Sequence, residues 1–340
     1  MESYKSMISR ALQALEHDDE DAARRLALRA FASRPEGATH DKKLVALLSA
    51  VEAHGEAIAL ASQMLESSGQ AQDAITLAHA LTESGDLRSG YDVLRHAASD
   101  ASMGDSREIA ERLIILAIAR RDVDGLEQIA GGYLRITDSE WATAAATRAL
   151  ELARADELTQ EMRRIAYVFS GSVVLGGEEC EDDEVADYWF FTHDDHTVAW
   201  TLRRLSCVAA SLGWRFGSVV SSDPKLDPVV SAATHILKCD ESSGEAPTLK
   251  ILGIVNNESS LEKSTHEIVF AMGFDGDWNR LTAWGGVDIL GLPVEGEIEL
   301  EGDILAAYEQ LPPDRAVAAI TAFYERFQFR TPALTLSRRR

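Results

Sequence analysis

The sequence is poor in cysteine and lacks long apolar runs, the features that mark disulfide-rich and membrane proteins. It holds three cysteines, Cys180, Cys207 and Cys239, and none of them forms a C-x-x-C pair. An odd number of isolated cysteines disfavours a disulfide framework and is typical of free thiols in the reducing cytoplasm. No run approaches the roughly 18 apolar residues that a transmembrane helix needs. The first residues, Met1 to Lys5, lack the basic and apolar segments of a secretory signal, so we expect a cytoplasmic protein without membrane contact.

Positive charge is also scarce. The chain carries 33 Lys and Arg against 56 Asp and Glu, which gives a formal net charge of −23. Binding to phosphates requires clustered Lys and Arg, and the only basic cluster is the tail Arg338 to Arg340. The composition therefore argues against a nucleic-acid-binding role. The excess negative charge is compatible with a basic protein partner, although many acidic proteins are acidic for solubility alone.

What remains is the composition of a folded soluble protein. Hydrophobic residues make up 46% and charged residues 26% of the 340 residues, with only eight prolines. That length suits two domains of about 150 residues each. The amino-acid composition changes near Tyr167, after which all three cysteines and five of the six tryptophans occur. We therefore expect a first domain over residues 1–165 and a second over residues 166–340.

Small residues recur at a fixed spacing in the first half, which has almost no strand signal. Ala23, Ala27 and Ala30 share one face of a predicted helix that ends before Pro35. Steps of 34 residues lead to comparable helices with turn residues between them. The later members of the series are Ala57, Ala61 and Met64, then Tyr91, Arg95 and Ala98, and then, shifted by one residue, Leu126, Ala130 and Tyr133.

This pattern resembles the tetratricopeptide repeat, in which each unit is a pair of antiparallel helices. The resemblance covers residues 4–138. It lacks the large aromatic residue and the Leu-Gly pair of the family's first helix, and only one copy keeps the proline. It implies an array of stacked helix pairs whose concave face binds a protein or peptide; a generic helical bundle is the alternative. The segment Trp141 to Arg164 is expected to be a cap helix.

The second half alternates strand and helix signals. Strands are predicted over Tyr167–Leu175, Tyr188–Phe191, Trp214–Val220, Leu249–Val255 and Glu267–Met272, with weaker ones over Trp284–Leu290 and Glu297–Leu300. Helices are predicted over Thr197–Leu212, Asp303–Gln310 and Asp314–Phe327, while Val229–Lys238 is ambiguous. These elements fit an α+β domain with a central sheet and flanking helices.

One run in this half concentrates chemically useful side chains. His193, Asp194, Asp195 and His196 lie between a predicted strand and a predicted helix, where open α/β sheets usually bind ligands. Imidazole and carboxylate are suitable ligands for a divalent metal such as zinc or manganese. The run resembles in part the H-x-H-x-D-H motif of metallo-β-lactamase-like hydrolases, with Phe191 in place of the first histidine. The structural alternative is that Asp194 or Asp195 caps the following helix.

A second, weaker metal candidate follows the strand that ends near Met272. Asp275 and Asp277 form a D-x-D pair that resembles the manganese–nucleotide-sugar motif of some glycosyltransferases. Asp275-Gly276 is also a strong turn signal, which is the structural alternative.

The sequence therefore predicts an adaptor or regulatory protein that binds a protein or peptide partner through the helical array. The alternative is a metal-dependent hydrolase or transferase with its site at His193 to His196. In that enzyme His193, His196 and Asp195 would hold the metal, and Asp194 or Asp195 would act as general base.

Overall fold

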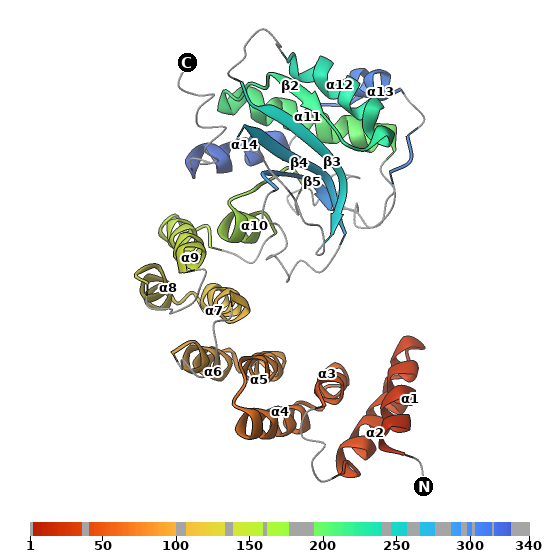
Figure 1. Ribbon diagram of the computed structural model, residues 1–340, viewed down its shortest axis with the longest axis vertical. Helices are drawn as coiled ribbons and strands as arrows, with labels where there is room; N and C mark the ends of the chain where they lie inside the picture. Colours follow the sequence, from red (N-terminus) through yellow and green to blue (C-terminus); the bar gives the residue numbers. More distant parts are fainter. Residues whose placement is uncertain are drawn as a thin grey trace. The chain divides into compact units, whose positions relative to one another are not determined.

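The computed structural model describes residues 3–35, 41–99, 107–132, 139–158, 162–176, 194–239, 246–256, 266–275, 287–293, 298–300, 303–314 and 316–327. The chain divides into two compact units, residues 1–153 and 154–340. The first consists of helices, and the second combines a parallel sheet with helices, which confirms the predicted fold class (Figure 1). Over the described residues, no helix has both the length and the apolar character needed to cross a membrane.

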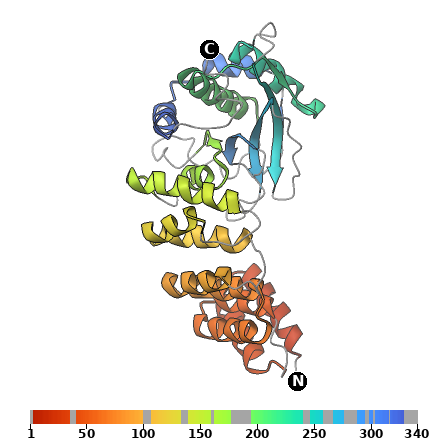
Figure 2. The same cartoon turned by 60° about the vertical axis from the view of Figure 1, so that its left-hand side comes forward.

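The first unit is a succession of helices. They are α1 (Tyr4–Glu16), α2 (Glu20–Ala32), α3 (Lys42–Ala50), α4 (His54–Ser68), α5 (Ala71–Glu83), α6 (Leu87–Ser99), α7 (Arg107–Ala119), α8 (Val123–Ala130) and α9 (Ser139–Arg154). Within this unit α1, α3, α5 and α7 lie in one layer and α2, α4, α6 and α8 in another (Figure 1), and Figure 2 shows the helices stacked along the chain.

One turn geometry joins the two helices of each pair. The residue two positions before each second helix has a left-handed φ: 56° at Asp18, 56° at Glu52, 86° at Gly85 and 51° at Arg121. In every copy the next amide donates to the carbonyl five residues back, as Asp19 does to Ala14 and Asp122 does to Ala117. This bonding is that of a Schellman motif, which ends one helix and sets the start of the next. The pairs are therefore copies of one structural unit.

The second helices begin at residues 20, 54, 87 and 123, so successive starts are 34, 33 and 36 residues apart. The predicted small positions Ala23, Ala27 and Ala30 are fully buried, as are Ala57, Ala61 and Met64. The third copy is one residue shorter than a strict 34-residue period. The positions equivalent to those of the first two copies are Gly90, Leu94 and Ala97, and all three are buried. Of the residues that the sequence placed in this series, Tyr91 is buried as well, whereas Arg95 is half exposed.

The second unit is built on a five-stranded sheet in its described part. Its elements are α10 (Met162–Ser170), β1 (Val173–Val174), α11 (Asp195–Leu212), β2 (Ser218–Val220), the 3₁₀ turn η3 (Pro224–Leu226), α12 (Asp227–Leu237), β3 (Thr248–Asn256), β4 (Glu267–Asp275), β5 (Ile289–Pro293), α13 (Ile304–Gln310) and α14 (Ala316–Arg326). The strand order is β1-β5-β4-β3-β2, and every neighbouring pair is parallel. The central strand β4 is buried from Ile268 to Gly273, as a strand covered on both faces requires.

Two helices lie side by side against this sheet, α11 and α14 (Figures 1 and 2). Helix α11 approaches β5 at Gly291, where an added Cβ would lie 3.1 Å from the methyl group of Thr201. Helix α14 approaches β1 through Tyr324, whose hydroxyl accepts a hydrogen bond from the Val174 amide at 2.7 Å. Tyr324 is fully buried, so this bond satisfies a polar group that water cannot reach.

Two local predictions were wrong. The segment Tyr167–Leu175 was expected to be a strand, but α10 continues to Ser170 and only Val173 and Val174 are in β1. Residues 166 to 169 are all buried, and an apolar run that is buried on every side has no period that separates strand from helix. The expected single cap helix is instead two helices, because α9 ends at Arg154 and Asp156 has a left-handed φ of 58°.

The remaining strand predictions for this unit differ mainly in their bounds. Strands β3 and β4 cover the predicted segments, and α12 resolves the ambiguous one as a helix. Strand β5 begins at Ile289, later than expected, and Ile298 forms only a single bridge. The predicted strand Tyr188–Phe191 lies outside the described residues.

Candidate functional site

The start of α11 is the part of the predicted site that the structure describes. Since the strands are parallel, their carboxyl ends share one edge of the sheet, and open α/β sheets bind ligands along that edge. β1 ends there, and α11 is the next described element along the chain. Asp194, Asp195 and His196 lie together at its first turn.

Asp194 caps this helix. Its Oδ1 accepts hydrogen bonds from the amide and the hydroxyl of Thr197, both at 2.7 Å. Partial burial acts to raise the pKa of Asp194, but the bonds from Thr197 and the charge of His196 outweigh it, so the pKa lies below its usual value of 3.8. The carboxylate is therefore ionised at neutral pH and satisfies amides that the helix itself leaves free.

Asp195 joins two helix starts. Its Oδ2 accepts a hydrogen bond from the amide of Asp303 at 3.0 Å, and Asp303 is the residue that caps α13. The first turns of α11 and α13 consequently lie next to each other, although the two residues are 108 positions apart in the chain. A helix start carries partial positive charge, so the Asp195 carboxylate stabilises both helices.

His196 is exposed, and its ring stacks on that of Trp200, one turn further along α11. The ring centroids are 6.3 Å apart and the planes differ by 19°. Trp200 itself is buried, and its indole N–H has no hydrogen-bond partner among the described residues. The contact holds the imidazole against the helix while leaving it accessible.

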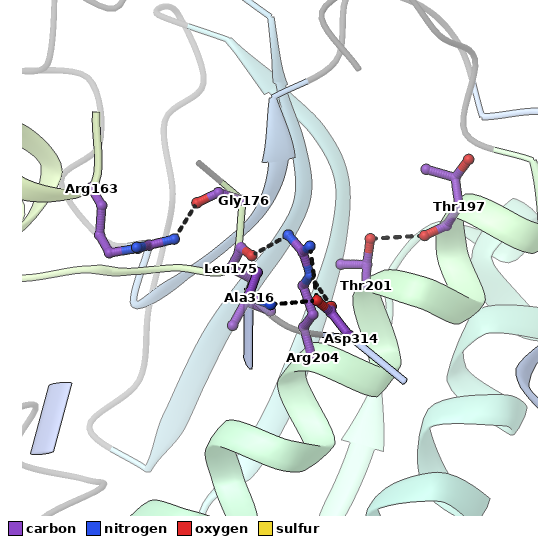
Figure 3. A network of polar contacts seen from close by, with 8 residues as sticks. All are labelled: Arg163, Leu175, Gly176, Thr197, Thr201, Arg204, Asp314 and Ala316. Carbon is purple, nitrogen blue, oxygen red and sulfur yellow. Dashed lines mark hydrogen bonds and ion pairs between the residues drawn. The ribbon is translucent and has the colours of Figure 1, made fainter. Parts of the chain in front are cut away.

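A network of buried arginines fixes the end of β1 (Figure 3). Arg204 of α11 is ion-paired with Asp314, which precedes α14, and its Nη1 donates to the carbonyl of Leu175 at 3.0 Å. Arg163 of α10 donates to the carbonyl of Gly176 at 3.1 Å. The two carbonyls that follow β1 are thereby held by guanidinium groups from two different helices.

The structure brings only part of the predicted metal site together. His193 and Asp277 lie outside the described residues, and Asp275 is the last residue of β4. Over the described part of the chain, no three His, Cys, Asp or Glu side chains are placed to hold a metal ion. Metal binding at His193 to His196 therefore stays a prediction.

Sequence reasoning missed the arginine network. The signal was present in α11, where Arg204 falls on the apolar face between Leu202, Leu205 and Val208. A charged residue at a core position implies a buried partner. Asp314 could not have been identified, because the two residues are 110 positions apart.

The cysteines offer no reactive thiol in the described part of the chain. Cys207 and Cys239 are half-buried, and burial raises the pKa of both thiols. A raised pKa keeps a thiol protonated and poorly nucleophilic at neutral pH.

No family model and no curated protein matches the chain. Among solved structures it is similar to a mutant O-GlcNAc transferase of Thermobaculum terrenum, with 14% sequence identity and a TM-score of 0.24. The match covers 85% of this chain and 42% of that one, so the chain spans less than half of the length of that enzyme. A likeness at this level carries no argument about function.

Proposed function

We propose that the helices of the first unit form tetratricopeptide-like repeats over residues 4–138 and bind a protein or peptide partner. The observation that carries this proposal is the turn that recurs at Asp18, Glu52, Gly85 and Arg121 with the same φ region and hydrogen bond. A turn of the same type in every pair favours stacking of similar pairs, and stacked pairs present one face of every first helix as a continuous surface. Such surfaces are the binding faces of helical repeats.

The partner that suits this protein is a basic one. The net charge of −23 favours encounter with a positively charged protein and disfavours nucleic acids and other polyanions. The negative charge increases the rate of association, and the residues on the surface of the array determine which segment binds.

Panning a random peptide library on the full chain tests this function. Hydrogen exchange with the selected peptides should show protection in residues 3–132, since binding shields amides at and near the contact. Protection confined to residues 194–327, or the absence of any selected peptide, would show that the array does not bind peptides.

The second candidate is a metal-dependent hydrolase or transferase at the start of α11. It is favoured by the meeting of α11 and α13 through Asp195 and Asp303. Helix α11 is the next described element after β1, and open α/β sheets bind ligands where their strands end. Metal analysis of the untagged chain, alone and with His193→Ala or His196→Ala, is the test. Stoichiometric zinc or manganese that both substitutions remove supports the enzyme; metal content unaffected by them rejects this site.

A further inference from the structure

Residues 155–158 lie between α9 and α10 in the chain and are held in place by side chains. Within the described part of the chain, no backbone hydrogen bond ties them to α10 or α14. Glu157 provides the contact with both helices instead. Its Oε2 lies 2.6 Å from Nη2 of Arg164 in α10, and its Oε1 lies 3.2 Å from Nη1 of Arg326 in α14. We call residues 155–158 the strap, because one carboxylate fastens this segment to two helices.

Arg326 holds the strap at a second point. Its Nη2 donates to the carbonyl of Ala155 at 3.3 Å, so one guanidinium group contacts the strap at two residues. Both arginines also lie over aromatic rings at the end of α14. The guanidinium carbon of Arg164 is 5.4 Å from the ring centroid of Phe323, and that of Arg326 is 5.6 Å from the ring centroid of Phe327. This stacking keeps both guanidinium groups within reach of the strap carboxylate.

The contacts of the strap are accessible to water. The side chain of Arg326 is 54% exposed and that of Glu157 is 29% exposed. Leu158 is the one buried side chain among the four residues of the strap. Exposed ion pairs are weak and are screened by salt, whereas a pair as buried as Arg204 and Asp314 is screened much less. The strap can therefore open under conditions that leave the buried pair intact.

Helix α14 does not depend on the strap for its place in the second unit. The hydroxyl of Tyr324 accepts the bond from the Val174 amide at 2.7 Å. The hydroxyl of Tyr167 donates to the carbonyl of Phe327 at 3.1 Å, and all three aromatic side chains are buried. These bonds remain when the strap leaves α14, so its opening is a local event.

We propose that the strap is a latch, which Glu157 closes and which opens, while the second unit stays folded, when salt screens the charges of Arg164 and Arg326. The chain divides into its two units between Ala153 and Arg154, directly before the strap. A closed latch fixes the backbone that follows α9, and an open latch leaves it free. The latch thus controls the freedom of the segment that joins the helical array to the sheet domain.

Limited trypsin digestion of the full chain tests the latch. A protease binds several residues in an extended form, so cleavage after Arg154 requires the strap to open, and its rate follows the open population. Glu157→Gln removes the charge from both ion pairs. We expect it to speed the formation of the fragment that ends at Arg154 by about threefold or more, as measured by mass spectrometry.

Asp156→Asn is the matched control, because it removes the same charge from the neighbouring residue. Asp156 is exposed and makes no ion pair with any described residue. Its φ of 58° is one that asparagine also adopts, so the substitution adds no backbone strain. This variant should be cleaved after Arg154 at the wild-type rate.

Two further measurements separate the latch from a general effect of charge. The ratio of the Glu157→Gln rate to the wild-type rate should fall towards one in about 1 M NaCl, where the screening length is about 3 Å. Glu157→Gln and Arg326→Gln together should speed cleavage by less than the product of their separate effects, because both break the same pair. Equal acceleration by Asp156→Asn, a ratio that does not respond to salt, or a wild-type rate for Glu157→Gln would overturn the proposal. Early cleavage of Glu157→Gln throughout residues 194–327 would also overturn it, since Glu157 would then hold the fold of the whole unit.

Discussion

Arg204 and Asp314 form an ion pair inside the second unit. The Nε atom of Arg204 lies 2.5 Å from Oδ2 of Asp314, and the side chains are 2% and 1% exposed. Asp314 also accepts a bond from the Ala316 amide at 2.9 Å, so it fixes the start of α14, while Arg204 holds the Leu175 carbonyl. One pair thus connects α11, α14 and the end of β1 (Figure 3).

Breaking this pair should be costly. Arg204→Met or Asp314→Leu leaves the other charge buried without its counter-ion, and we expect each to destabilise the second unit by about 3–5 kcal/mol. The double substitution should cost much less than the sum, because it removes both buried charges. Hydrogen exchange in urea measures the second unit separately from the first. Strictly additive effects would show that the two side chains act independently.

The left-handed position of the recurrent turn favours glycine, so removing glycine from one copy and introducing it in another should have opposite effects on stability. Gly85 adopts a φ of 86° with open space around it, so Gly85→Ala should cost about 1 kcal/mol through backbone strain alone. Arg121 adopts 51° without being glycine, and Arg121→Gly should stabilise the first unit by about 0.5 kcal/mol. Thermal unfolding of the two variants provides the comparison. Destabilisation by Arg121→Gly would mean that its side chain contributes more than the strain costs.

The first unit could be predicted because its sequence pattern recurs, so several copies independently indicate the same pair of helices. The burial of Ala23 and Ala57 follows from that pattern. The burial of Gly90 in place of Tyr91 at the equivalent position does not follow from it, because the third copy is one residue shorter than 34. That difference is visible only when the copies are aligned on the turn at Gly85 and not on a fixed 34-residue period. The end of helix α10 was predicted as a strand for a related reason: residues 166 to 169 are buried one after another, so their burial shows no helical period.

At the candidate site, local contacts could be predicted and distant ones could not. A carboxylate just before a helix is a usual cap, and Asp194 is one. Asp195 bonds to Asp303, and Arg204 pairs with Asp314. Each of these pairs is more than 100 positions apart in the chain and comes together only in the folded protein. Sequence spacing carries no information about such pairs.

Removing the cap of α11 should have a pH-dependent effect. Asp194→Ala loses the bonds to Thr197 and should cost about 1 kcal/mol at neutral pH. The pKa of Asp194 is lowered in the folded protein, so this stabilisation is complete above its unfolded value, near 3.8, and is lost as pH falls through the lower folded value. The difference in stability between wild type and variant, measured by exchange of α11 amides, should therefore shrink below that pH. A difference that stays constant into strong acid would contradict an ionised cap.

Gly291 is the position in the sheet that should tolerate a side chain least. A Cβ added there would lie 2.2 Å from the carbonyl oxygen of Met272 and 3.1 Å from the Thr201 methyl group. Neither the β4 backbone nor the buried helix α11 can move aside easily, so Gly291→Ala should destabilise the second unit by about 3 kcal/mol. Gly253→Ala in β3 is the control, because its Cβ would meet only the ends of side chains, Ile298 Cδ1 at 3.1 Å and Leu226 Cδ1 at 3.9 Å. We expect that variant to unfold close to wild type in urea, and equal losses for both would show that close approach at Gly291 is not the cause.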